Sequence, residues 1–303
     1  MMSGRKIAII MMSAVVCIWG AEYSVAKTLM ETFSPVNVLL FKYIVCLICM
    51  AVIRFSLVKG VKTSPKDYLQ FMVSTFSGIV LYFLFDYKAM DYMPISLVTI
   101  VLAFVPVVSI IIDRIVFKRK MTARILLGVA GSVIGVAIVI GPDIGLLMQG
   151  RIIGYVLAFG AVLSWNAYNF LAEPLSKKYP PIVVAFNQVF CAFLLVLPLQ
   201  LTALPDLSKF TPSMVVGVLY LGILSGVIGY MTVPLGLKHL GPTISGVFSN
   251  FLPISSTFFA WVILGESMGP VQLAGGVVVI GFSCMVIIEI NKRNRIEEQE
   301  AQQ

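Results

Sequence analysis

The sequence predicts an all-α integral membrane protein, and three observations indicate it. Of the 303 residues, 59% are hydrophobic and only 12% are charged, giving a mean hydropathy of +0.99; soluble domains contain about 45–50% apolar residues. The apolar residues form runs of roughly 20, the length of a helix that crosses a ~30 Å hydrocarbon core. Polar turns separate the runs, whereas a membrane barrel would show shorter, alternating segments. The lipid bilayer is therefore the first expected partner.

Ten apolar runs are expected to cross the membrane as helices. They cover residues 7–26, 35–53, 68–89, 95–112, 125–140, 152–171, 181–201, 214–237, 243–264 and 271–290. The first run follows Arg5 and Lys6 as a signal peptide would, but it lacks a convincing cleavage site, so we expect a retained helix. Residues 291–303 are polar and are expected to form a frayed cytoplasmic tail.

The basic residues are distributed asymmetrically between the loops. With the N-terminus inside, 17 Lys and Arg residues fall at the inner ends of the runs and only Lys27, Lys88, Arg151 and Lys209 at the outer ends. Lys and Arg of short loops stay in the cytoplasm, so both termini are expected there, in the plasma or inner membrane of a cell. This bias explains the net charge of +8 without a nucleic-acid partner.

The chain repeats itself at an offset of 146 to 147 residues. The offset aligns Trp19 with Trp165, Pro35 with Pro181, Pro106 with Pro253 and Gly128 with Gly275. It divides the chain into a first five-helix repeat, residues 1–145, and a second, residues 146–290. Because five crossings are an odd number, the second repeat is expected to be inverted in the membrane. Inverted repeats are typical of secondary transporters.

Four charged side chains in the apolar runs are candidates for function: Glu22, Asp86, Lys42 and Lys27. Charges inside a bilayer cost several kcal/mol and usually face a cavity or a partner. A rise of 1.5 Å per residue places the first three in the outer half of the membrane and Lys27 near its rim. Glu22 and Lys27 lie about 140° apart around one helix, so each is expected to meet a neighbouring helix.

Two interpretations of these charges remain open. A carboxylate in a medium of low dielectric titrates nearer neutral pH, so Glu22 or Asp86 is a candidate for exchanging a proton or binding a substrate ammonium group. Alternatively, the charges form permanent salt bridges between helices. The counterparts of Lys42 and Asp86 in the second repeat are Gln188 and Val233, so the first repeat is expected to supply most of any ionic site.

Aromatic and amide side chains complete the candidate substrate site. They are Trp19, Tyr23, Trp165, Asn166, Asn169, Gln188 and Asn250. Residues four apart share a helix face, as Trp19 does with Tyr23 and Trp165 with Asn169, and such rings can stack on a ring or an organic cation. The alternatives are interfacial anchoring for the aromatic residues and hydrogen bonding between helices for the amides.

Prolines and glycines predict how the helices bend and pack. Pro106 and Pro253 occupy matched positions and are expected to kink their helices, because proline frees a carbonyl of the preceding turn. The kinks are either hinge or cavity-shaping positions or simply kinks that membrane helices tolerate. Two G-x-x-x-G spacings, at residues 131–135 and 222–226, permit close helix contact. We expect that contact within one chain, which leaves a monomer or a homodimer.

No catalytic residue, metal site or cofactor is predicted. All five cysteines lie in apolar runs, which argues against a disulfide framework. The single histidine, His239, lies in a predicted cytoplasmic loop and has no nucleophile or acid at a suitable spacing.

Several short motifs occur in a recognisable order. They are Trp19-Gly20 with Lys27, Phe41-Lys42-Tyr43, the segment 85–92, Pro106, Pro253 and Gly265-Glu266. Over residues 7–290 this order resembles the drug/metabolite transporter superfamily, and within it the ten-helix EamA-type exporters. One departure is Arg119, which occupies the position matching Glu266 where an acidic residue is usual. The resemblance implies a site lined by helices one to four and six to nine.

The expected function is that of a secondary transporter. The resemblance implies export of small metabolites such as amino acids or their derivatives by alternating access, with protons as a candidate coupling ion. A multidrug carrier or a nucleotide-sugar or phosphate-ester carrier is the alternative within the superfamily, although phosphate needs more embedded cations than Lys42 and Lys27. A channel and a membrane-embedded enzyme are the alternatives from other classes.

Overall fold

The computed structural model describes residues 4–58, 60–116, 118, 121–140, 151–202, 204–264 and 270–300, and within them every regular element is a helix. Six helical stretches in these ranges are long and apolar enough to cross a membrane: Gly4–Met30, Pro35–Leu57, Pro65–Ala89, Leu97–Ile115, Pro181–Leu201 and Pro212–Ile263. Two shorter apolar helices, Ala123–Ile138 and Ala274–Ile290, accompany them. The predicted all-α membrane class is confirmed at this level.

The helical elements follow one another with short connections. The first half contains α1 (Gly4–Met30), α2 (Pro35–Leu57), η1 (Pro65–Asp67), α3 (Tyr68–Thr75), η2 (Phe76–Leu81), α4 (Tyr82–Ala89), α5 (Ile95–Leu102), α6 (Val105–Ile115) and α7 (Ala123–Ile140). The second contains α9 (Ile152–Lys178), α10 (Pro181–Val196), η3 (Leu197–Thr202), η4 (Leu207–Lys209), α11 (Pro212–Leu219), η5 (Tyr220–Ile228), α12 (Gly229–Val247), η6 (Phe248–Phe251), α13 (Leu252–Leu264) and α14 (Pro270–Glu300).

Helix starts are marked by a hydroxyl residue followed by proline. The Ser34 hydroxyl accepts a hydrogen bond from the backbone N–H of Asn37 at 3.3 Å, and Pro35 follows it as the first residue of α2. Thr211 caps α11 in the same way, with Pro212 next to it. Proline suits this place because its missing N–H would be unpaired in the first turn anyway.

The expected fraying of residues 291–303 is wrong up to Glu300. α14 continues as a helix from the apolar run through to Glu300. Residues 291–300 are rich in Lys, Arg, Glu and Gln, which have high helix propensity, so continuation of the helix beyond the apolar run agrees with the local sequence.

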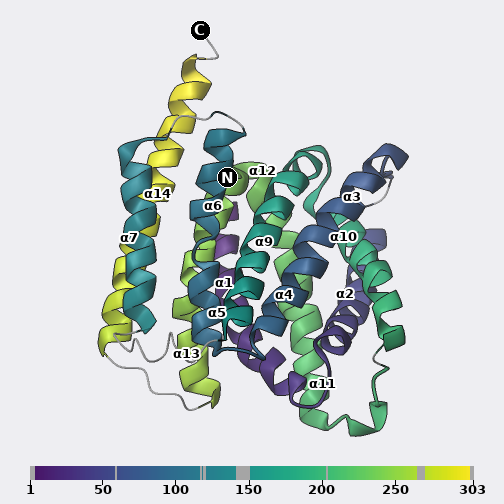
Figure 1. The fold of residues 1–303 in the computed structure, drawn as a ribbon. Helices are drawn as coiled ribbons and strands as arrows, with labels where there is room; N and C mark the ends of the chain where they lie inside the picture. Colours follow the sequence, from purple (N-terminus) through teal and green to yellow (C-terminus); the bar gives the residue numbers. More distant parts are fainter. Residues whose placement is uncertain are drawn as a thin grey trace.

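α7 and α14 lie side by side at one edge of the molecule, as Figure 1 shows at the left. Arg124 of α7 lies 3.5 Å from Glu289 of α14, and the glycines of the 131–135 spacing face Phe282 and Val279 of α14. The other G-x-x-x-G spacing, 222–226, packs against Val45 and Cys46 of α2. Both spacings therefore pack within the chain, as expected.

α1 and α9 form the centre of the molecule. α1 packs against α12, α13 and η5, and α9 packs against α3, η2, α4, α5 and α12. The remaining pair, α2 and α10, contact each other at the opposite side from α7 and α14 (Figure 1). Each half thus reaches across to the other, so a site between α1, α4 and α9 is built from both halves.

Two π-helical segments interrupt long helices at matched positions. η2 lies between α3 and α4, and η5 lies between α11 and α12. An offset of 147 residues carries η2 onto residues 223–228, the second part of η5. π-helical turns are rare and frequent at functional sites, and each of these lies against helices of the other half, η2 on α9 and η5 on α2.

Pro106 and Pro253 lie in the first turn of a helical segment rather than in mid-helix, where we expected them. Pro106 is the second residue of α6, after a break from α5 at Ala103 and Phe104, and Pro253 is the second residue of α13, after the 3-10 turn of η6. Each helix is therefore interrupted before the proline. The proline lies in the first turn of the next segment, where its missing N–H removes no helical hydrogen bond.

Gly78 of η2 allows a close approach of the two halves. A Cβ atom at this position would lie 1.9 Å from Cβ of Tyr168 in α9, far inside van der Waals contact. By contrast, Gly281 of α14 has nothing within 4 Å of its Cβ position.

We expect Gly78→Ala to lower the free energy of unfolding by about 1–3 kcal/mol or more, because η2 and α9 must separate to admit the methyl group. The matched control is Gly281→Ala, which is expected to be neutral or slightly stabilising, since alanine favours a helix more than glycine does. Thermal unfolding of both variants in detergent measures the difference. Equal melting temperatures for the two variants would show that η2 and α9 are not in close contact.

Candidate functional site

A small enclosed cavity lies between the two halves. It is lined by aromatic and acidic side chains, Trp19, Glu22, Tyr23, Tyr82, Phe83, Asp86, Tyr87, Trp165 and Tyr230, and completed by Leu102, Val105, Ser249 and Leu252. Its volume is about 30 Å³, which is room for about two water molecules at ~10–15 Å³ each. The cavity is too small for a metabolite, so the structure shows a closed conformation.

Glu22 of α1 is held by donors from three other helical elements. Its Oε1 accepts from Lys42 Nζ of α2 at 2.5 Å and from the Tyr87 hydroxyl of α4 at 2.8 Å. Its Oε2 accepts from the Ser225 hydroxyl of η5. Glu22 is 3% exposed, so its charge is stabilised by these donors rather than by water.

Lys42 is as deeply buried as Glu22, at 1% exposed. Besides the Glu22 carboxylate, its ammonium group faces the rings of Phe83 at 4.0 Å and Tyr230 at 5.6 Å from their centroids. Cation–π contacts add to the ion pair when water is excluded. Lys42 therefore has its charge balanced inside the chain and is not a free cation for a ligand.

Asp86 of α4 has no ion pair among the described residues like the one that holds Glu22, although the Tyr23 hydroxyl interacts with its carboxylate. It is 1% exposed and lines the cavity, and its Oδ1 accepts no hydrogen bond from any described residue. A charged carboxylate in a dry site is very costly unless it is paired. A proton or a cationic group at the Asp86 carboxylate would remove that cost.

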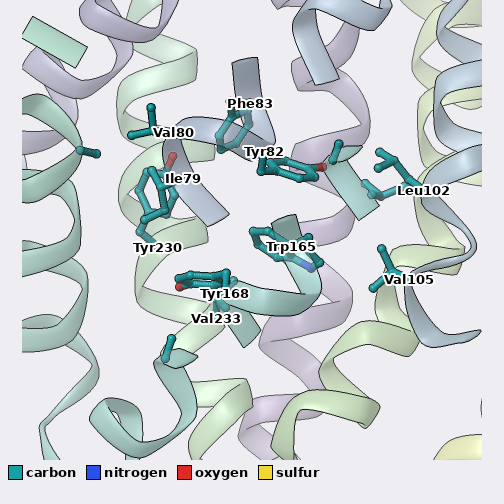
Figure 2. Close-up of a cluster of buried hydrophobic side chains, with 14 of the residues drawn as sticks. Ile79, Val80, Tyr82, Phe83, Leu102, Val105, Trp165, Tyr168, Tyr230 and Val233 are labelled. Atoms are coloured by element: carbon teal, nitrogen blue, oxygen red, sulfur yellow. The ribbon is translucent and has the colours of Figure 1, made fainter. Parts of the chain in front are cut away.

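A row of rings runs from the Asp86 side of the cavity to its far side. Tyr82 contacts Trp165 with centroids 5.0 Å apart, and Trp165 contacts Tyr168 at 5.1 Å. Figure 2 shows Trp165 between the other two rings, with Leu102 and Val105 beside it. Trp19 meets Trp165 edge to face at 5.8 Å, so two residues related by the sequence repeat touch each other at the cavity.

The predicted amides do not line the cavity. Asn166 is occupied by the Ser109 hydroxyl at 2.5 Å and by two backbone carbonyls, and Asn250 donates to Ser132 of α7 at 2.7 Å. The Gln188 Oε1 accepts from the Tyr168 hydroxyl at 3.1 Å. Neither Gln188 Nε2 nor the side-chain N and O of Asn169 has a hydrogen-bond partner among the described residues. Asn166 and Asn250 thus join helices, while Gln188 and Asn169 keep unused polar atoms.

The structure brings together Trp19, Glu22, Tyr23, Lys42, Asp86 and Trp165, and leaves Lys27 outside. Lys27 is exposed at the end of α1 and does not line the cavity. The motif Gly265-Glu266 and its counterpart Arg119 lie outside the described residues. Glu22 meets Lys42 on a neighbouring helix rather than Lys27 on its own, which agrees with the angle between them.

Sequence reasoning missed several polar groups of the structure. Tyr87 and Ser225 complete the coordination of Glu22, and nothing in a single tyrosine or serine of an apolar run indicates such a role. Asp113, only 2% exposed, accepts a hydrogen bond from Thr243. Asp113 lies one residue beyond the predicted run 95–112, so its burial was hidden by the position of the run's end.

The end of the bundle where α3 begins is closed by polar contacts. Lys178 of α9 lies 2.6 Å from Asp67 of η1, and the Tyr179 hydroxyl donates to the same Asp67 Oδ2. The Ser64 N–H donates to the Tyr179 oxygen at 3.0 Å, and Asn187 of α10 donates to Thr63 at 3.1 Å. The segment before α3 is therefore fastened to the junction of α9 and α10.

We expect Asp67→Asn to produce a small decrease in melting temperature, because it weakens a partly exposed contact that joins distant segments. The matched control is Asp91→Asn, which removes the Lys88–Asp91 pair of 2.7 Å between residues three apart in the chain. That pair joins no distant segments, so no change is expected. Thermal unfolding of the two variants side by side decides it, and a larger decrease for Asp91→Asn would contradict a fastening role for Asp67.

Comparison with known proteins agrees with this architecture. A solved crystal structure superposes with a TM-score of 0.75, covering 92% of this chain and 97% of that chain at 15% sequence identity. That likeness shows a shared fold.

Three relatives lie between 23% and 24% identity. The uncharacterized transporter YyaM of Bacillus subtilis is 23% identical, over 92% of this chain and 93% of its own length. A probable amino-acid metabolite efflux pump of Salmonella typhimurium is 24% identical over 62% of this chain and 66% of its own length. A probable terminal-alkyne amino-acid exporter of Streptantibioticus cattleyicolor is 23% identical over 69% and 68%.

The family model of the EamA-like transporters matches the chain twice, over residues 6–141 and 152–288. The two matches together cover nearly the whole chain, including every residue that lines the cavity. The protein is a membrane transporter that belongs to the EamA-like transporter family.

Proposed function

We propose that this chain is a secondary exporter of small metabolites that carry an ammonium group, such as amino acids or their derivatives, and that it works by alternating access around the Asp86 cavity. The observation that carries the proposal is the Asp86 carboxylate, which is buried at the wall of a small cavity between the halves, with one oxygen unpaired and no ion pair among the described residues. The names of the two amino-acid exporting relatives support this substrate class.

The proposed arrangement has ten crossings in two inverted five-helix repeats, with both termini in the cytoplasm of a cell, in its plasma or inner membrane. Two matches of one family model support the repeat. The stretch Pro212–Ile263, 52 residues long, supports a double crossing, because ~20 residues span the hydrocarbon core and Gly241 breaks the stretch at φ 80°. The breaks before Pro106 and Pro253 are the proposed hinges.

Protons are the proposed coupling ion. Asp86 can hold a proton or a substrate ammonium group but not both, so binding of one releases the other. Within such a cycle Glu22 and Lys42 keep the first half together, since each already balances the other. The same ion pair disfavours a phosphate-ester carrier, because Lys42 is occupied and no Lys or Arg is among the described residues that line the cavity.

Counter-exchange in proteoliposomes tests the proposal. Proteoliposomes that contain the purified protein are loaded with a pool of labelled amino acids, and unlabelled amino acids are added outside. Two variants are assayed in the same way. Ser249→Trp fills the cavity wall, and Ser208→Trp places the same ring in an exposed turn as its control. Saturable exchange by the native chain and the control, with loss in Ser249→Trp, is expected.

The other outcomes are distinct. Flux that never saturates and needs no substrate on the far side would indicate a channel. Exchange that survives in Ser249→Trp would place the pathway elsewhere in the molecule. No exchange of any amino acid by the native chain would overturn the proposed substrate class.

A further inference from the structure

The second half contains an uncharged counterpart of the Glu22–Lys42 pair. Tyr168 and Gln188 follow Glu22 and Lys42 by 146 residues each. The Tyr168 hydroxyl donates to Gln188 Oε1 at 3.1 Å, where the charged pair has its 2.5 Å contact. Both pairs join the first two long helices of their half, α1 to α2 and α9 to α10.

The uncharged pair lies beyond the cavity on the side away from Tyr82. Trp165 lines the cavity, Tyr168 packs against its other side, and Gln188 hydrogen-bonds to Tyr168. Figure 2 shows Tyr82 and Tyr168 on opposite sides of Trp165. α9 runs from Trp165 through Tyr168 toward Lys178, the end that is fastened to Asp67. Trp165 and Tyr168 therefore link the cavity to Gln188 through direct contacts.

Two buried amide side chains, Asn169 of α9 and Gln188 of α10, have hydrogen-bonding capacity that the closed conformation does not use. Gln188 is 0% exposed and Asn169 is 1% exposed. Gln188 Nε2 and both polar atoms of the Asn169 side chain have no partner within the described chain. A buried polar group without a partner is destabilising, so three such atoms on α9 and α10 are available to hydrogen-bond with water or a ligand.

We propose that Gln188, Asn169 and Tyr168 form a second substrate position, which binds the carboxylate or carbonyl end of the substrate when the rings of Trp165 and Tyr168 move apart. The proposal rests on the function proposed above, that the Asp86 cavity carries a substrate. Amide N–H groups donate to a carboxylate oxygen without a charge of their own, so they bind it and release it readily. Asp86 then selects for the ammonium group and the amides select for the acidic group.

The consequence is a preference for zwitterions over simple amines. A cavity with Asp86 alone would bind any small amine equally well. With the second position, an amino acid gains contacts through its carboxylate. The corresponding amine, which lacks the carboxylate, does not make these contacts.

Tryptophan fluorescence measures binding at this site. Of the three tryptophans, Trp19 and Trp165 line the cavity and Trp261 is 49% exposed, so Trp261→Phe leaves only reporters at the cavity. The probes are leucine and isopentylamine, which differ only by the carboxylate and absorb no light where tryptophan does. In the Trp261→Phe background, Gln188→Met replaces the amide by an apolar chain of similar size.

Gln188→Met is expected to raise the Kd of leucine about tenfold, from loss of one hydrogen bond to a charged group, and to leave the Kd of isopentylamine unchanged. Unchanged binding of the amine also shows that the variant is folded. Gln188→Glu is expected to weaken leucine further and to tighten isopentylamine.

Three results would overturn the inference and are distinguishable. If Gln188→Met binds leucine as the native chain does, the second position is refuted and the proposed Asp86 site is unaffected. An equal loss for both probes would make Gln188 a packing residue. If neither probe changes the fluorescence of the native-like background, the Asp86 cavity itself is not a substrate site, and the proposed function fails together with the second position.

Discussion

Lys42→Met is expected to lower the free energy of unfolding by about 3–5 kcal/mol, the effect of removing one partner from a buried ion pair. The loss is large because the Glu22 carboxylate, at 3% exposure, would lose its charged partner and keep only the hydroxyl groups of Tyr87 and Ser225 as donors. The double variant Glu22→Gln with Lys42→Met carries no charge there. It is expected to recover most of the loss, since a neutral pair of similar volume avoids the desolvation of both ions.

The matched control for this cycle is Gln188→Met, which breaks the uncharged Tyr168–Gln188 contact at the corresponding place in the second half. Its expected cost is about 1 kcal/mol, the usual net value of one neutral hydrogen bond. Denaturant titration in detergent micelles gives the free energy of unfolding of the native chain and of the three variants. If the single and the double variant lost stability equally, the methylene chain of Lys42 rather than its charge would stabilise the helices.

The positions of the long helices were predictable, because a segment that crosses the bilayer must be a continuous apolar run. Runs of about 20 apolar residues, interrupted by turn residues such as Ser34-Pro35 and Thr211-Pro212, indicate helices before any tertiary contact is known. Irregular segments were not predictable in this way. The π-helical turns of η2 and η5 and the breaks before Pro106 and Pro253 arise from packing against the other half, which local sequence does not encode.

The candidate site was predictable in its members but not in their roles. A charge in an apolar run is conspicuous, so Glu22, Lys42 and Asp86 could be named, whereas which carboxylate holds the lysine depends on helix rotation to within a few degrees. The surrounding rings illustrate the same limit. Tyr82 and Tyr230 line the cavity, but aromatic residues are common in membrane helices, and only the packing of α4, α9 and α12 distinguishes them from anchors at the interface.

The difference between the two carboxylates leads to the remaining large effect. Asp86→Asn is expected to weaken binding of an ammonium substrate by about 30- to 3,000-fold, because a desolvated charge contact contributes about 2–5 kcal/mol and each 1.4 kcal/mol is a factor of ten. Glu22→Gln is expected to act mainly on stability, since Glu22 is occupied by Lys42. Binding of isopentylamine, followed by the fluorescence of the tryptophans at the cavity, separates the two variants.

The pH dependence of the same binding follows from competition at Asp86. A proton neutralises the carboxylate, so the affinity for an ammonium group falls as the pH falls, and it rises as the pH rises until the carboxylate is fully charged. Asp86→Asn has no proton to exchange at this position. Its affinity is expected to be weak and to stay constant over the pH range in which the affinity of the native chain changes. Asp86→Glu retains the charge and is the control that should retain the pH dependence. A native chain whose affinity is independent of pH, or a Glu22→Gln variant that alone abolishes the dependence, would assign proton exchange to another group and reduce Asp86 to a structural residue.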